Sequence, residues 1–166
     1  MRRLPLISVQ VEGVLGRGAL LTGLSRYLSD LQLSVAVEAE LWAPLEEAGR
    51  GAGSWPPPGL ANTSLAQAMA GWTGQPGYPL ISVTRQQEGA GLVVRLTQAR
   101  YVSDGSGRVG EEVLWSVPVT LGLVPVGGGT LDWQQAWLTA SNISIDLPAA
   151  TLATPLILNK QEEQIK

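Results

Sequence analysis

The sequence predicts an α+β protein in which a helical segment of about three helices is followed by an antiparallel β-sandwich. In the first part of the chain, apolar residues recur at helical spacing. From about Tyr78 onward they alternate with polar residues at a period of two, and glycine-rich turns separate the alternating runs. We therefore expect a helical region over residues 1–76, a sandwich over 77–159 and a divergent tail over 160–166.

The helical region contains three candidate helices. The first has one apolar stripe of Leu20, Leu21, Leu24, Tyr27, Leu28 and Leu31. A second candidate runs from about Val37 to Glu47, where Pro44 should lie in the first turn or else kink or shorten the helix. A third is indicated by Ser64 and Gln67 at capping-box spacing, and a glycine- and proline-rich loop over residues 49–59 precedes it.

The sandwich is predicted from short alternating runs. Turn signals at residues 88–91, 103–107 and 127–129 separate them. The inward-facing positions are expected to be Ile81 and Val83, then Leu92, Val94 and Leu96, then Val113, Trp115, Val117 and Val119, then Ile143, Ile145 and Leu147.

The composition excludes several kinds of chemistry. The 166 residues include no histidine and no cysteine, so imidazole bases, thiol nucleophiles and N- or S-ligated zinc sites cannot form within the chain. The net charge is -3, and the only lysines are Lys160 and Lys166, so nucleic acid is not expected as a partner. No apolar run approaches the roughly 20 residues that a membrane-spanning helix needs.

One segment resembles a known family. The sequence Trp72-Thr73-Gly74-Gln75-Pro76-Gly77-Tyr78-Pro79 is similar to the Trp-Thr-x-Gln-x-Gly-(Tyr/Phe)-Pro segment of aminopeptidase N type zinc metallopeptidases, where a helical catalytic domain leads into a β-sandwich domain. Shorter matches in the family's order cover roughly residues 14 to 120. These matches are Leu15-Gly16, Gly23-Leu24, Tyr27-Leu28, Leu41-Trp42-x-x-Leu45, Gln98-Ala99-Arg100-Tyr101 and Trp115-Ser116-Val117-Pro118-Val119.

The resemblance implies that the parent protein removes amino-terminal residues from peptides by means of a zinc-bound water, with a glutamate as general base. The family's H-E-x-x-H zinc motif would lie upstream of this chain. We therefore expect no catalytic, metal-binding or cofactor-binding residue here, and no enzyme activity in the isolated chain. Its partners would be the parent's catalytic and carboxy-terminal domains, and peptides would bind only to the full-length parent.

The resemblance also implies structural roles for particular residues. Trp72 would end the last helix, and Gly77, Tyr78 and Pro79 would complete a hinge between the helical and sandwich domains. The remaining matched positions, expected to be sandwich structure, are Gln98, Arg100, Trp115 and Pro118.

A second class of function remains open from the sequence, namely a free-standing β-sandwich binding or adhesion module. Trp133 and Trp137 could form an aromatic platform for a sugar or peptide. The favoured interpretation is that three tryptophans fill the core and three cover edges left bare by absent domains. The core set is Trp42, Trp72 and Trp115, and the edge set is Trp55, Trp133 and Trp137.

Two further sequence patterns are pairs of adjacent glutamates and triplets that accept N-linked glycans. The pairs Glu46-Glu47 and Glu111-Glu112 are expected to be solvated surface, because adjacent side chains point apart on a helix or strand. Asn62-Thr63-Ser64 and Asn142-Ile143-Ser144 are N-glycosylation sequons. They suit an extracellular or cell-surface ectodomain, which is the location expected from the resemblance.

Overall fold

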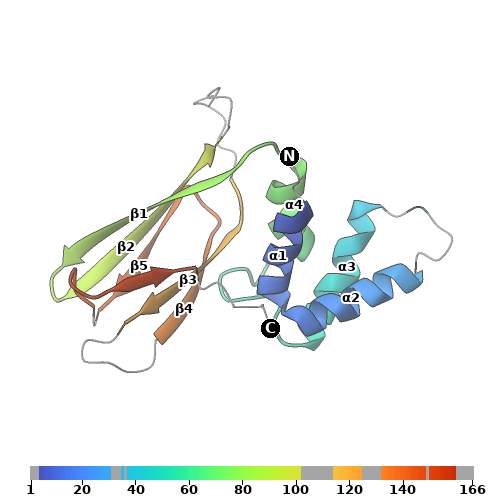
Figure 1. The fold of residues 1–166 in the computed structure, drawn as a ribbon, viewed down its shortest axis with the longest axis horizontal. Coiled ribbons are helices and arrows are strands. Elements are labelled where there is room, and N and C mark those ends of the chain that lie inside the picture. The colour runs from blue at the N-terminus through green and yellow to red at the C-terminus, as the bar shows by residue number, and fades with distance from the viewer. Residues whose placement is uncertain are drawn as a thin grey trace. The chain divides into compact units, whose positions relative to one another are not determined.

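The computed structural model describes residues 4–30, 35, 37–101, 114–124, 132–148 and 150–159. Within these residues the chain forms four helices followed by six strands, which confirms the α+β prediction (Figure 1). By its internal contacts the chain separates into two compact units, Met1–Gln75 and Pro76–Lys166. Several predicted positions lie outside the described residues: Leu31, the turns at 103–107 and 127–129, Glu111, Glu112, Val113 and the tail over 160–166.

The helical unit begins with a helix that the sequence analysis did not predict. Helix α1 spans Leu4–Leu15 and is followed by α2, Arg17–Asp30. Val11 and Leu15, four residues apart, are buried on one side of α1. Gly16 separates the two helices with a φ of 80°, a conformation that favours glycine. The predicted count of about three helices therefore becomes four.

Helix α2 packs against α3, Glu38–Gly51, and only part of the predicted apolar stripe is buried. The buried residues of α2 are Ala19, Leu20 and Gly23. A Cβ atom on Gly23 would lie 2.8 Å from the Cα of Leu45, so the two helix backbones approach closely there. Two leucines of the predicted stripe, Leu21 and Leu28, are 55% and 67% exposed. The close approach at Gly23 turns them away from α3.

Helix α3 continues past its proline. Pro44 lies inside the helix rather than in its first turn, and the helix reaches Gly51, so the predicted shortening and the loop start at residue 49 are both wrong. An interior proline removes one helical hydrogen bond. Trp42 and Leu45 on either side of it are buried, and their burial favours the continuous helix.

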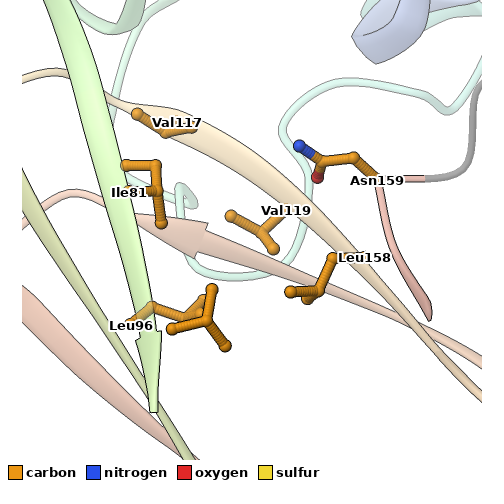
Figure 2. A pocket seen from close by; sticks show the side chains of 7 residues that line it. Ile81, Leu96, Val117, Val119, Leu158 and Asn159 are labelled. Carbon is orange, nitrogen blue, oxygen red and sulfur yellow. The ribbon is translucent and has the colours of Figure 1, made fainter. Parts of the chain in front are cut away.

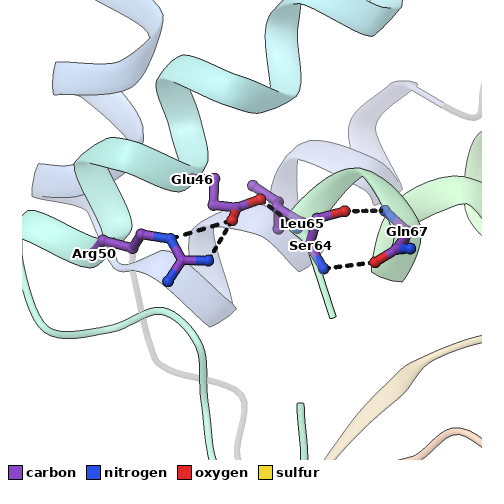
Figure 3. Close-up of polar contacts among 5 residues, drawn as sticks. All are labelled: Glu46, Arg50, Ser64, Leu65 and Gln67. Carbon is purple, nitrogen blue, oxygen red and sulfur yellow. Dashed lines mark hydrogen bonds and ion pairs between the residues drawn. The ribbon is translucent and has the colours of Figure 1, made fainter. Parts of the chain in front are cut away.

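Helix α4 spans Leu65–Gly74 and begins at the predicted capping box. The Gln67 N–H donates to Ser64 Oγ at 3.2 Å, and the Ser64 N–H donates to Gln67 Oε1 at 2.9 Å (Figure 3). Each bond satisfies a backbone donor that the helix itself leaves unpaired. Leu65 and Met69 are buried, and Trp72 is half-buried.

The second unit contains two three-stranded antiparallel sheets. In one sheet β1, Tyr78–Glu88, pairs with β2, Gly91–Tyr101, and β2 pairs with β5, Asn142–Leu147. In the other, β3, Val117–Leu123, lies between β4, Asp132–Leu138, and β6, Leu156–Leu158. The antiparallel sandwich prediction is thus confirmed, although β4 was not foreseen as a strand.

Strands β1 and β2 form a hairpin with a two-residue loop. Glu88 pairs with Gly91, and Gly89 has a φ of 59°, whereas Ala90 has no positive φ. A positive φ at the first loop residue alone is typical of a type II′ turn, which suits the twist of a hairpin.

The sandwich core follows the predicted alternation. Its inward-facing residues in β2 and β3 are buried: Leu92, Val94, Leu96, Val117, Val119 and Leu121.

The tryptophans divide differently from the prediction. Trp42 and Trp115 are buried as expected, but Trp55 and Trp137, which were assigned to edges, are also buried. Trp137 is only 7% exposed, so it cannot form an accessible aromatic platform with Trp133. The Trp133 ring lies over Gly122, because a Cβ atom there would lie 2.7 Å from its Cζ3.

Candidate functional site

The residues singled out by the resemblance fall in the helical end and in the sandwich, and Gln98 has the most interactions among them. Gln98 continues the inward face of β2 and is buried. Its Nε2 donates to the carbonyls of Trp115 at 3.1 Å and Ala140 at 2.7 Å. Its Oε1 accepts from the Trp115 N–H at 3.0 Å. The side-chain amide thereby joins β2 to the segments that lead into β3 and β5.

Gly77 lies just before β1 and could not be replaced without a change in the backbone. Its φ is 93°, and a Cβ atom would lie 2.8 Å from the carbonyl oxygen of Tyr101. The same Cβ atom would lie 3.3 Å from Cγ and Nε of Arg100. Arg100 pairs with Pro79, and its Nε is buried without a hydrogen-bond partner in the described part of the chain.

Tyr78 and Tyr101 face each other at the first register position of the β1–β2 hairpin. Their ring centroids are 4.8 Å apart and the ring planes are tilted by 33°. Loss of solvation raises the pKa of Tyr78, and the neighbouring Tyr101 phenol raises it further. Both rings and Leu80 remain exposed, so this end of the outer sheet face is aromatic and apolar.

Pro118 is placed where its missing N–H costs the sheet nothing. The Asn159 N–H donates to the Thr120 carbonyl at 2.8 Å, so the backbone groups of Thr120 point toward β6. By the two-residue alternation of a strand, the backbone groups of Pro118 point to the same side and away from β4. The β6 register covers only Leu121 to Leu123, so Pro118 removes no donor from either described ladder.

An apolar groove lies between β1 and β6 on the open side of the sandwich. It has a volume of about 190 Å³. Figure 2 shows Ile81 from β1 facing the side chains of Val117 and Val119 from β3, with Leu158 and Asn159 closing one side. Among the residues that the structure describes, no titratable side chain lines it, so these residues offer no acid, base or nucleophile there.

In the helical unit a half-buried carboxylate connects α3 to α4. Glu46 Oε2 accepts from the Leu65 N–H at 2.8 Å, and Glu46 Oε1 pairs with Arg50 Nη2 at 2.6 Å (Figure 3). Its side chain is 17% exposed, so the expectation of a solvated surface is wrong for Glu46. Glu47 does lie at the surface and pairs with Arg26 at 2.7 Å. The negative charge of Glu46 lies at the positive end of α4, which is favourable.

A second groove lies between α3 and α4. It has a volume of about 510 Å³. Small side chains line most of it, so another helix or loop could approach the α4 backbone closely. Its lining residues are Glu38, Ala39, Trp42, Ala66, Ala70, Thr73 and Gly74.

The described residues do not fit a zinc site. The chain has no histidine or cysteine, and nowhere among the described residues do three potential metal-ligating side chains gather. No step of zinc chemistry can therefore be derived from this chain. Asn62 and Asn142, the two sequon asparagines, are both exposed. No helix in the described ranges is long and apolar enough to cross a bilayer.

Helices that lead into an antiparallel sandwich place the described residues in the α+β class. The chain superposes on a crystal structure of Legionella pneumophila aminopeptidase A with a TM-score of 0.65, over 92% of this chain and 15% of that chain. At 9% identity, this likeness shows the fold alone. No protein-family model matches the chain.

Several curated relatives of the chain are aminopeptidases. The chain is 33% identical to a puromycin-sensitive aminopeptidase of Caenorhabditis elegans over 116 residues. This matched stretch covers 70% of this chain and 10% of that protein. It is also 33% identical to Aminopeptidase M1 of Arabidopsis thaliana over 111 residues. This matched stretch covers 67% of this chain and 10% of that protein. The chain belongs to the aminopeptidase N type family and spans about a tenth of the length of these relatives.

Proposed function

We propose that this chain is a structural, inter-domain coupling piece of an aminopeptidase and has no peptidase activity of its own. One observation carries the proposal: 70% of the chain aligns with an aminopeptidase at 33% identity, whereas its described residues contain no cluster of metal ligands. Zinc, the general base and the peptide-binding site would lie in other segments of the parent. Peptides would bind only to the full-length protein.

The surface of the helical unit supports a docking role. Several large apolar side chains are exposed on it, which is unfavourable in water unless another surface covers them. The groove between α3 and α4 offers further apolar surface for contact. We infer that the catalytic domain of the parent covers these residues, of which the most exposed include Val9, Leu21, Leu28 and Val37.

The sandwich unit would couple the catalytic domain to a carboxy-terminal domain. The hydrogen bonds of Gln98 join β2 to the residues that lead into β3 in the other sheet. A displacement of one sheet would therefore be passed to the other sheet. Trp72, Gly77, Tyr78 and Pro79 would form the hinge. The positive φ of Gly77 supports this role, since it sets the direction in which the chain enters β1.

We also infer an extracellular or cell-surface location for the parent. One relative, 30% identical over 109 residues, is a membrane alanyl aminopeptidase of Heliothis virescens. The exposure of both sequon asparagines is compatible with the secretory pathway.

A chimera tests the proposed function. In the Caenorhabditis elegans relative, the 116 matched residues would be replaced by those of this chain, and hydrolysis of an aminoacyl nitroanilide would be measured. We expect the chimera to be active and the isolated chain to be inactive. Hydrolysis by the isolated chain would contradict the proposal, as would a chimera with the circular dichroism spectrum of its parent and no activity. Gln86→Leu, at an exposed position of β1, is a control that should leave the chimera active.

A further inference from the structure

The outer face of the β1-β2-β5 sheet has two chemically different halves. We infer that Asn142 on its polar half bears an N-linked glycan, and that this half faces solvent in the complete protein. The inference rests on the secretory location proposed above. It concerns a modification and a surface rather than peptidase activity.

The register places Asn142 on the outer face. In β5 the residues Ile143, Ile145 and Leu147 face inward opposite the buried residues of β2. Asn142 therefore points outward, and it is exposed at the first position of the strand. Its Nδ2 donates to the exposed Ser141 Oγ at 3.3 Å, so a substituent on this nitrogen would disturb no buried contact.

The neighbours of Asn142 are polar. Asn142 pairs with Thr97, and Thr97 pairs with Ser82 across the sheet. Around Val93, which is half-buried on the same face, exposed polar side chains continue from this row toward the hairpin end, so a hydrated sugar would meet little apolar surface. These side chains are Thr84, Gln86, Arg95, Ser144 and Asp146.

The other half of the same face is different. One row beyond Ser82 lies the exposed Leu80, and beyond it lies the Tyr78–Tyr101 pair. Exposed aromatic rings and leucine are the residues that interfaces bury. A glycan on Asn142 would leave this aromatic half available for a neighbouring domain.

The modification is a group transfer. Asn142 Nδ2 forms a bond to the anomeric carbon of an oligosaccharide, and the bond from that carbon to the diphosphate of a lipid-linked donor breaks. The amide loses a proton, and the lipid diphosphate leaves. The Ser144 hydroxyl completes the triplet that the transferase recognises.

The acceptor is tested by secretion of the chain from eukaryotic cells behind a cleavable signal sequence. We expect peptide N-glycosidase to release the glycan from the wild-type protein, which lowers its mass, and to convert residue 142 to aspartate, as seen by mass spectrometry. Asn142→Gln and Ser144→Ala should abolish that conversion, whereas Ser144→Thr, which keeps the triplet, should retain it. An unmodified Asn142 in the secreted, folded wild type would overturn the inference. This result would be independent of whether the chimera above is an active peptidase.

The division of the face is tested by moving the triplet. Leu80→Asn creates an Asn-Ile-Ser sequence over residues 80–82, the same triplet as at Asn142 and on the same face. In a secreted form of the active chimera, the natural glycan should leave activity unchanged. A glycan at position 80 should reduce activity at least several-fold. Leu80→Gln is the control, because it changes polarity without adding a sugar. If the glycan at position 80 leaves activity as high as Leu80→Gln does, the proposed division is wrong.

Discussion

The side-chain amide of Gln98 binds the backbone of Trp115 through both of its polar atoms. Oε1 accepts from the Trp115 N–H at 3.0 Å, and Nε2 donates to the Trp115 carbonyl at 3.1 Å. The amide thus makes the two hydrogen bonds that the backbone of a neighbouring strand would otherwise make to Trp115. It does so where β2 and the residues before β3 belong to different sheets. A third bond to the Ala140 carbonyl satisfies the second hydrogen of Nε2.

Gln98→Leu should destabilise the sandwich strongly. It leaves the buried N–H and carbonyl of Trp115 without this partner, at about 1–3 kcal/mol for each unsatisfied group, and also removes the part-buried bond to the Ala140 carbonyl. We expect the free energy of unfolding to fall by about 3 kcal/mol or more in urea titrations followed by tryptophan fluorescence. Gln86→Leu, on the exposed face of β1, should change it by less than about 0.5 kcal/mol. Equal effects of the two substitutions would show that the Gln98 bonds contribute little.

Gly77→Ala should also destabilise the second unit. The new methyl group meets the Tyr101 carbonyl at 2.8 Å, and the backbone is held at a φ of 93°. We expect a loss of about 1–3 kcal/mol on thermal unfolding. Gly74→Ala is the matched control, since nothing lies within 4 Å of the added atom there. A fully stable Gly77→Ala variant would exclude the close approach.

Gly23→Ala should disrupt the packing of α2 on α3. The added atom lies 2.8 Å from the Leu45 Cα and 3.0 Å from the Pro44 carbonyl, both of which are backbone atoms that cannot move aside. Overpacking of this kind costs about 1–3 kcal/mol. Gly18→Ala in the same helix has open space and should stabilise it by up to about 1 kcal/mol. Opposite signs for the two substitutions in chemical denaturation would verify the helix crossing.

Glu46→Ala should weaken the junction between α3 and α4. It removes the acceptor for the Leu65 N–H and the partner of Arg50, at about 1–2 kcal/mol by analogy with a lost helix cap. Glu47→Ala removes only an exposed pair with Arg26 and should cost less than about 0.5 kcal/mol. Hydrogen exchange at the Leu65 amide should accelerate in the first variant and not in the second. Unchanged exchange in Glu46→Ala would contradict the capping role.

Tyr78 should make stability fall at alkaline pH. Loss of solvation raises its pKa, so the folded protein holds this proton more tightly than the unfolded chain does. The contribution is complete below the unfolded value of about 10 and declines as the pH rises through the folded pKa. Tyr101→Phe should lower the Tyr78 pKa only in part, because the loss of solvation remains. Phenolate absorbance would measure both titrations, and an ordinary Tyr78 value in the folded wild type would refute this prediction.

The sequence by itself determined the features that depend on near neighbours. Ser64 and Gln67 of the capping box are three residues apart, and the alternating residues Leu92, Val94 and Leu96 all lie within four positions of one another. Local backbone geometry sets both patterns, so periodicity and capping rules were sufficient to predict them. The segment around Trp72 and Gly77, together with shorter matches in the same order along the chain, likewise indicated the family.

Only the tertiary structure decided which partners distant residues meet. Gln98 could be singled out from its motif, but its acceptors lie 17 and 42 residues further along the chain. Glu46 looked like a surface carboxylate until α4, 19 residues away, brought its N-terminus to the oxygen. Leu21 and Leu28 share a helical stripe, yet the close approach at Gly23 leaves them exposed. Periodicity shows that a helix has an apolar side, but the backbone that comes nearest determines which part of that side is buried.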